Sequence, residues 1–499
     1  MTDFHWGLSG EKKGFAIDGG VRATSIVANI FMGAALLGIA KKTALPNGNL
    51  SWAPIKADSL IAIMSTVGGL CGAVFMPIVG AIVDHSEKRW HIGFGSVLLL
   101  CLINMVQVIV SEDTWVFIAV LQLFAGFCYT THLVVVYAYL PELSNDPEEL
   151  NRINSITNTF VYLGQFVFLF TAIVLSFITG AEDVGQARIS QVMVSVIGLI
   201  GYNYTWMTKM KNRPALNVMD PNASYLTFGF RKISKTLHGL KDEFKPVLTF
   251  LVSITCAEAA TTAFVSIAVT YTTAVLEMEV KETGILIALV IFFAIPGSLI
   301  FRKVTNKIGL HESYMLALFY WFSVTAISPI FMNEPSQSGN SYIFGVFWGL
   351  GFGWLFPTQR SIYCLIIPGG QESELMGLYV FAGQIFVWFP PAIFAIMNQA
   401  GISMSWGLVN DSCFFLVAFL VNYFLLYGQV MRGAIEKAKE TQHKRIMSDD
   451  SHENKIGTFV RTSSSGEDGI EMGEVEVYGV TREGDTILRV SENDKEGML

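Results

Sequence analysis

The chain contains several stretches of about twenty residues without a single charged side chain. Four of them are residues 92–110, 155–179, 189–207 and 284–301. Because an α-helix rises about 1.5 Å per residue, each stretch is long enough to cross a hydrocarbon core about 30 Å thick. Only 15% of all residues are charged and 52% are hydrophobic, whereas soluble domains carry about 25% charged residues. These stretches predict a helical protein that crosses a membrane many times.

Apolar windows along the chain predict an all-α membrane protein with twelve transmembrane helices in two pseudo-symmetric six-helix bundles. The predicted spans are residues 23–40, 59–83, 92–110, 114–140, 155–179, 189–207, 247–275, 284–301, 313–333, 341–366, 375–399 and 412–430. The predicted organisation is an N-terminal segment 1–22, a bundle 23–207, a linker 208–246, a second bundle 247–430 and a tail 431–499. Residues 1–13 are polar and the first apolar stretch is a full span, so we expect a retained anchor rather than a cleaved signal peptide.

The basic residues between the predicted spans fall mainly on one side of the membrane. The linker 208–246 alone holds eight lysines and arginines and only three acidic residues. Positively charged loops stay in the cytosol, so this side, with both termini, is predicted to be cytosolic. The opposite side carries a glycosylation sequon at Asn49-Leu50-Ser51. The polar tail is expected to be disordered in the cytosol.

Several function classes lack support in the residues. All six cysteines lie inside predicted spans without paired spacing, so neither a disulfide framework nor a metal site is indicated. No nucleotide-binding loop, zinc-protease helix or hydrolase elbow occurs. We therefore expect no enzyme, no cofactor and no nucleic-acid partner, and we expect a monomer in contact with membrane lipid.

The two predicted bundles resemble each other residue by residue. Gly126 and Gly353 are 227 positions apart, and so are Pro141 and Pro368. After each proline the next helix contains a Gly-Gln pair, Gly164-Gln165 and Gly383-Gln384. Parallel repeats of this kind build many membrane transporters. The repeat therefore favours a secondary transporter of small solutes.

Small residues and prolines predict local features of three helices. Glycines in helix 2 (Gly68, Gly69 and Gly72) and in helix 10 (Gly349, Gly351 and Gly353) are expected to let helices approach closely. The pair Pro390-Pro391 is expected to kink helix 11.

A family resemblance begins at the loop after helix 2. The sequence from Gly80 to Arg89, with Asp84 and the basic pair Lys88-Arg89, resembles the loop that major facilitator superfamily transporters carry between helices 2 and 3. The partner loop after helix 8 departs from the pattern, with Asn306 in place of the usual aspartate. The resemblance implies that Asp84, Lys88 and Arg89 are gating residues that help lock one conformational state.

Within that superfamily, two signatures are similar to those of the autophagy-related vacuolar amino-acid effluxers. One runs from Arg360-Ser361 through Ile367-Pro368 to Tyr379, and the other joins Leu140-Pro141 to Asn151-Arg152. The resemblance covers about residues 18–427, although the first helix departs from it at residues 17–22. It implies proton-coupled or uncoupled export of amino acids from a vacuole or lysosome to the cytosol, with the plasma membrane as the alternative location.

Two other readings remain open. One is a porter of the same fold for another small solute, such as a sugar, an organic anion or a nucleoside. The other is a membrane receptor or scaffold that does not transport. An ATP-driven pump is not supported, because no phosphate-binding loop is found.

Glu258 is a charged residue near the middle of predicted helix 7. A charge at the bilayer centre costs about 2.5–3.5 kcal/mol on insertion scales, so such a residue requires water, a partner or a function. Thr255, Glu258, Thr262 and Ser266 follow one another at three- or four-residue steps, which aligns them on one helical face. We therefore expect this face to be wet or covered by protein. The alternative is that Glu258 pairs with a neighbouring helix for packing or state-locking alone.

Arg22, His132 and Arg360 complete the predicted set of ionisable residues at hydrocarbon depth. With Glu258 they occupy helices 1, 4, 7 and 10, which line the central cavity in the superfamily that the chain resembles. We hypothesise that Arg360 or Arg22 holds a substrate carboxylate while Glu258 meets the amino group or carries a proton. His132 can equally be a hydrogen-bonded packing residue. Further candidates are Thr262 on the same face of helix 7 as Glu258, Gln165 in helix 5 and Gln384 in helix 11.

Arg360 has a second interpretation. It lies about 9 Å of helical rise from the end of its predicted span. It can therefore also be a cytosolic gate contact with Glu372 or Glu374.

Overall fold

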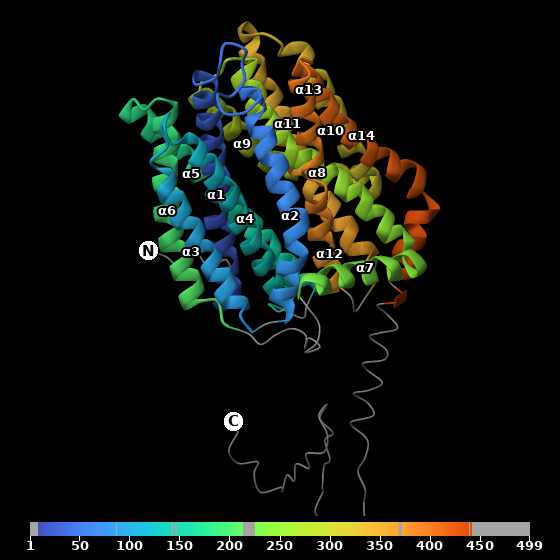
Figure 1. The fold of residues 1–499 in the computed structure, drawn as a ribbon. Coiled ribbons are helices and arrows are strands. Elements are labelled where there is room, and N and C mark those ends of the chain that lie inside the picture. Colours follow the sequence, from blue (N-terminus) through green and yellow to red (C-terminus); the bar gives the residue numbers. More distant parts are fainter. Residues whose placement is uncertain are drawn as a thin grey trace, which may run out of the picture.

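The structure is a computed structural model that describes residues 8–85, 87–140, 143–144, 147–212, 225–368, 372–438 and 440–441, and its named elements are all helices (Figure 1). The predicted tail after residue 441 lies outside the described residues. The N-terminal half consists of α1 (Gly10–Lys42), α2 (Leu60–His85), α3 (Arg89–Gln107), α4 (Trp115–Tyr139), α5 (Pro147–Thr179) and α6 (Asp183–Thr208), with a 3-10 turn η1 (Ala57–Ser59) before α2.

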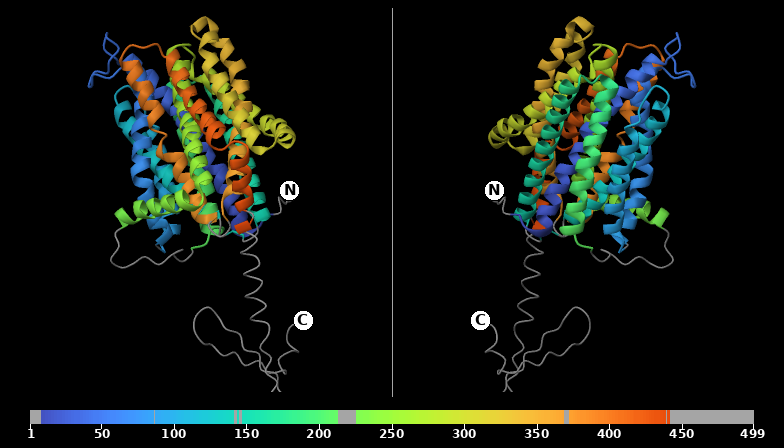
Figure 2. Two further views of the ribbon diagram at one scale, coloured as in Figure 1. Left: turned by 90° about the vertical axis from the view of Figure 1, so that its right-hand side faces the viewer. Right: turned by 90° about the vertical axis from the view of Figure 1, so that its left-hand side faces the viewer.

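The C-terminal half follows a helix in the linker, α7 (Tyr225–Glu243). It consists of α8 (Lys245–Ala274), α9 (Val280–Ile308), α10 (Leu310–Phe331), α11 (Ser338–Ile366), α12 (Glu372–Ile385), α13 (Phe389–Gln399) and α14 (Ser405–Leu425). The spanning helices run side by side through the molecule, whereas α7 lies across one end of them (Figures 1 and 2).

Eleven helices in the described part of the chain are long and apolar enough to cross a membrane. They match eleven of the twelve predicted spans, with α12 and α13 together forming one span from Leu375 to Gln399. The twelfth predicted span, residues 341–366, coincides with α11, a helix of 29 residues that packs along α9 and α10. The predicted class, an all-α membrane protein, is therefore confirmed.

Several helices extend beyond the apolar windows, and two of the extensions contain buried charges. Helix α1 begins at Gly10 rather than at residue 23, and α14 begins at Ser405 rather than at residue 412. Both extensions contain aspartates, Asp18 and Asp411, which are fully buried. A hydropathy window ends at a charged residue. The helix itself continues past that residue when the charged side chain is buried against other helices.

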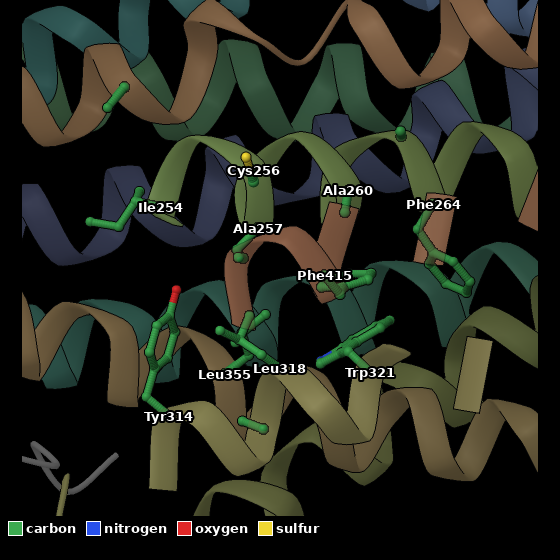
Figure 3. Close-up of a cluster of buried hydrophobic side chains, with 14 of the residues drawn as sticks. Ile254, Cys256, Ala257, Ala260, Phe264, Tyr314, Leu318, Trp321, Leu355 and Phe415 are labelled. Atoms are coloured by element: carbon green, nitrogen blue, oxygen red, sulfur yellow. The ribbon is translucent and has the colours of Figure 1, made fainter. Parts of the chain in front are cut away.

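Aromatic side chains fill the core of the C-terminal half. Trp321 of α10 stacks on Phe415 of α14 with ring centroids 5.1 Å apart, and Phe264 of α8 meets Trp321 edge-on at 5.5 Å (Figure 3). Helices α8, α10 and α14 thus form one packed unit.

Glycines set the closest helix approaches, as predicted for α11. A Cβ atom added to Gly353 would lie 2.1 Å from the carbonyl oxygen of Ala294 in α9. In α2 only Gly69 is similarly restricted, by the backbone of Trp388 at 2.9 Å, whereas Gly72 has open space beside it. The close-approach interpretation therefore holds for Gly69 but not for Gly72.

The proline pair interrupts helix 11. Helix α12 ends at Ile385, and α13 restarts at Phe389 with Pro390 in its first turn, where proline is tolerated because the N–H it lacks would have no helical partner. The predicted kink is confirmed as a complete break at mid-span.

The glycine contact between α9 and α11 can be tested by substitution. Gly353→Ala should lower the thermal unfolding midpoint of the detergent-purified protein by several degrees, because overpacking costs about 1–3 kcal/mol. Gly339→Ala in the same helix is the control, since no atom lies within 4 Å of its added Cβ. Equal midpoints for the two variants would contradict the proposed packing.

Candidate functional site

A buried carboxylate lies at the centre of the N-terminal half. Asp18 of α1 accepts a hydrogen bond from Trp206 Nε1 at 2.9 Å, and its Oδ1 lies 3.1 Å from His132 Nε2. Arg22, one turn further along α1, places its Nε 3.7 Å from Asp18 Oδ2. The other ring nitrogen of His132, Nδ1, lies 3.0 Å from the carbonyl oxygen of Gly93 in α3. Asp18 therefore joins helices α1, α4 and α6 in one hydrogen-bonded cluster.

A second carboxylate occupies the corresponding place in the C-terminal half. Glu258 of α8 accepts a hydrogen bond of 2.8 Å from Gln359 Nε2 of α11. The same amide nitrogen lies 2.9 Å from the hydroxyl of Tyr379 in α12, and Tyr314 of α10 donates to Gln359 Oε1 at 3.3 Å. Glu258 is only partly buried, whereas Gln359 is fully buried.

The two carboxylate clusters follow one plan. Each carboxylate lies on the first helix of its half, and its partner lies on the fourth helix: His132 and Gln359 are 227 positions apart, as are Gly126 and Gly353. Each partner also reaches the third helix of its half, at Gly93 in α3 and at Tyr314 in α10. His132 and Gln359 thus occupy equivalent positions of the repeat, whereas Asp18 and Glu258 lie on equivalent helices at different positions, 240 residues apart.

The clusters approach each other at Tyr137 of α4. The guanidinium of Arg22 lies over the Tyr137 ring, 5.7 Å from its centroid. Arg360 of α11 interacts electrostatically with Tyr137 as well as with Glu258 and Tyr379. Tyr137 thus contacts the arginine of its own half and interacts electrostatically with the arginine of the other half.

A cavity of about 200 Å³ adjoins this region and is lined by both halves. Its walls include Gly72 and Thr130 from the N-terminal half and Thr262, Gln384 and Pro391 from the C-terminal half. Thr262 lies one turn beyond Glu258, and Gln384 follows Gly383, whose added Cβ would lie 3.5 Å from Glu258 Cγ. Pockets for drug-sized ligands measure about 300–1,000 Å³, so this one suits a smaller solute.

Polar contacts join the halves at the end opposite α7. Lys56 donates a hydrogen bond to the carbonyl oxygen of Asn398 at 2.5 Å, and Asn398 Nδ2 donates to Ser59 at 2.8 Å. Nearby, the Val280 amide donates to Asp183 at 3.2 Å. These contacts close that end of the interface between the halves.

The remaining predicted residues have varied positions. Gln165 is partly buried in α5, and Lys88 is exposed at the start of α3. Arg89 is fully buried, with its guanidinium 5.2 Å from the Tyr139 ring centroid and Nη1 donating to the Ala138 carbonyl at 3.4 Å. The side chains of the other predicted gate residues lie outside the described residues; these are Asp84, Glu372 and Glu374.

The sequence reading missed three polar residues. Asp18 and Asp411 were hidden by the ends of the apolar windows, and Asp411 has no hydrogen-bond partner among the described residues. Gln359 was not predicted as a site residue, although its spacing of 227 positions from His132 marks it as the equivalent residue of the repeat. Among the described residues, no group of histidines, cysteines and acidic residues could hold a metal ion.

Solved structures with a similar fold are membrane transporters. A mutant of the nucleoside transporter NupG superposes with a TM-score of 0.58 at 12% identity, covering 83% of this chain and all of that chain. The inward-open xylose transporter XylE from E. coli superposes with a TM-score of 0.58 at 12% identity, covering 84% of this chain and 97% of that chain. Identity this low shows the fold alone, which is the major facilitator fold.

Sequence relatives point to one family within that fold. Autophagy-related protein 22-1 of Emericella nidulans is 22% identical over 297 residues, 55% of this chain and 49% of the relative. Autophagy-related protein 22 of Cryptococcus neoformans var. neoformans serotype D is 23% identical over 200 residues, 37% of this chain and 35% of the relative. The chain thus spans about half or less of the length of these relatives. The family model described as "Vacuole effluxer Atg22 like" matches residues 47–437, and the chain therefore belongs to the Atg22-like vacuole effluxer family.

Proposed function

We propose that this protein is a secondary transporter that moves amino acids from the lumen of a vacuole or lysosome to the cytosol by alternating access. The observation that carries the proposal is that Tyr137 contacts Arg22 and interacts electrostatically with Arg360, which in turn interacts with Glu258. An α-amino acid carries an ammonium and a carboxylate, and this junction offers opposite charges for both.

Glu258 is the proposed partner of the substrate ammonium. Gln359 is the hydrogen-bond donor that satisfies one of its oxygens, and the side chain remains partly accessible. A carboxylate can accept about four hydrogen bonds, so capacity remains for an incoming N–H group. Gly383 of α12 lies close to this side chain, since a Cβ added there would lie 3.5 Å from Glu258 Cγ.

The two arginines are the proposed partners of the substrate carboxylate. A planar guanidinium can donate two parallel hydrogen bonds to a carboxylate. Arg360 and Arg22 come from opposite halves, so a carboxylate between them would draw the halves together. This supports substrate binding as the step that permits the conformational change.

The route follows from the distribution of charge and contacts. We assign the end that carries α7 and its lysines to the cytosol by the positive-inside rule. The contacts of Lys56, Asn398 and Ser59 then lie on the lumenal side, so the conformation is closed to the lumen. A neighbour of similar fold, XylE, is named for its inward-open conformation.

A porter of the same fold for a neutral hydroxylated solute is the second candidate. Tyrosine hydroxyls near the junction favour it, and the neighbours NupG and XylE are named for a nucleoside and for xylose. Competition separates the candidates: an amino-acid porter should not be inhibited by excess nucleoside or xylose.

Glu258→Gln tests the substrate site. In proteoliposomes loaded with a labelled amino-acid pool, efflux should fall at least about tenfold, because losing a charge-assisted contact costs about 1.5–3 kcal/mol. Glu277→Gln, an exposed glutamate beyond the end of α8, is the matched control and should transport normally. Equal efflux from both variants, or wild-type efflux no faster than empty vesicles, would refute the proposal.

Arg89→Ala tests the predicted gate. Arg89 of α3 contacts α4 through the Tyr139 ring and the Ala138 carbonyl. It is not one of the proposed substrate-binding residues. We expect the maximal rate to fall while the KM changes less than about twofold, since conformational steps commonly set turnover. Lys88→Ala, which removes an exposed cation, should slow transport less. A change in KM or in substrate preference with Arg89→Ala would contradict the gating role.

A further inference from the structure

The hydrogen bonds of His132 fix the number of protons in its cluster. Gly93 offers a carbonyl oxygen at 3.0 Å from Nδ1, and Asp18 offers carboxyl oxygens at 3.1 and 3.2 Å from Nε2. A carbonyl only accepts, so Nδ1 must carry a proton. A second proton must then lie between Nε2 and Asp18, either on the imidazole or on the carboxyl. In both assignments the pair holds one proton more than a neutral histidine and an ionised aspartate.

The pair is enclosed by protein. Asp18 and His132 are both fully buried, and Asp18 also accepts from Trp206. The titratable or charged groups around the pair come from α1, α3, α4 and α6, and they are Arg22, Cys101, Tyr129, Tyr137 and Tyr202. Glu258 of α8 belongs to the other cluster. From α5, the residues against Gly19 and Gly20 are Thr157, Val161 and Phe160, which do not titrate.

Asp18 and Glu258 differ in what they can still bind. Three donors surround Asp18, from Trp206, His132 and Arg22, and no part of it is exposed. Glu258 is partly accessible, and Thr262, one turn further along α8, lines the cavity. Its partner Gln359 is an amide that cannot gain or lose a proton in the physiological range, whereas His132 can.

We propose that the Asp18–His132 pair carries the proton coupled to transport, while the equivalent Glu258–Gln359 pair binds the substrate ammonium. This inference rests on the proposed function, because it divides coupling and recognition between the two halves. It adds Asp18, as a proton-binding residue, to the site.

Proton loss changes the packing of the N-terminal half. The proton that leaves comes from the Nε2–Asp18 hydrogen bond, and it leaves a neutral histidine and an ionised carboxylate. The neutral ring retains one N–H for two acceptors, so either the Gly93 carbonyl loses this donor, or Asp18 loses it and keeps only Trp206 and Arg22. Leaving a buried acceptor without a donor costs free energy. Deprotonation therefore loosens α4 from α3 or from α1, which contains Arg22.

The test measures protons and substrate together. Full-length protein in proteoliposomes with a trapped pH-sensitive dye is supplied with a ¹⁴C-labelled amino-acid pool, and protons moved per labelled molecule are recorded. Wild type should move protons with label. His132→Gln places in α4 the residue type of its counterpart, Gln359, and should lower the proton-to-label ratio at least about fivefold. Glu258→Gln should lower label flux but keep the wild-type ratio.

The control is His238→Gln. His238 is an exposed histidine of α7 whose Nδ1 lies 2.7 Å from the Ser234 carbonyl oxygen of the same helix, so both the flux and the ratio should remain those of wild type. If His132→Gln fails to fold, the proton-to-label ratio of Asp18→Asn is measured in the same assay. This substitution removes the carboxylate but keeps an oxygen that can accept the hydrogen bond from Trp206. A wild-type proton-to-label ratio in either variant would overturn the inference. A lowered proton-to-label ratio in Glu258→Gln would overturn it as well.

Failure of the proposed function is distinguishable from failure of this inference. If wild type moves no label, the amino-acid function is refuted. The pair is then tested by infrared titration of the detergent-purified protein, in which a carboxyl or imidazole band should be lost in both Asp18→Asn and His132→Gln. Absence of such a difference would refute the proton site.

Discussion

The free-energy cost of removing ionisable groups from water is the constraint on which the rest of this structure depends. An ion taken into a protein interior loses several kcal/mol of hydration, and only partners with good geometry restore it. Asp18 meets this requirement with Trp206, His132 and Arg22, which come from three different helices. Glu258 meets it with Gln359 and remains partly accessible. The carboxylates thus dictate which helices lie together at the centre of each half.

Internal duplication explains why there are two such clusters. The same three helices of each half, first, third and fourth, are joined through the partner residue, His132 in one half and Gln359 in the other. Divergence at this position changes the chemistry, because an imidazole can carry a proton and an amide cannot. A duplicated scaffold can therefore serve two tasks, and Tyr137, which contacts Arg22 and interacts electrostatically with Arg360, links them.

The sequence predicted the fold well and the site in part. Uncharged runs predicted the spans, and the repeat spacing predicted two similar halves. The spacing of polar residues around Glu258 predicted a polar face on that helix. Asp18 and Asp411 were missed because an apolar window ends at the charge that a protein interior can bury. The role of Gln359 was missed because a single amide has no distinctive pattern; only the contact with Glu258 makes it visible. The meeting of residues from the two halves depends on tertiary packing, which local sequence does not encode.

A double-mutant cycle across the two halves tests the central claim that both halves act on one substrate. The dissociation constant of a labelled amino acid would be measured for wild type, Arg22→Lys, Arg360→Lys and the double variant. If both guanidiniums hold the same carboxylate, the losses in binding free energy should fail to add by at least about 0.5 kcal/mol. Losses that simply add, or a binding constant unaffected by either change, would contradict a shared site at the junction.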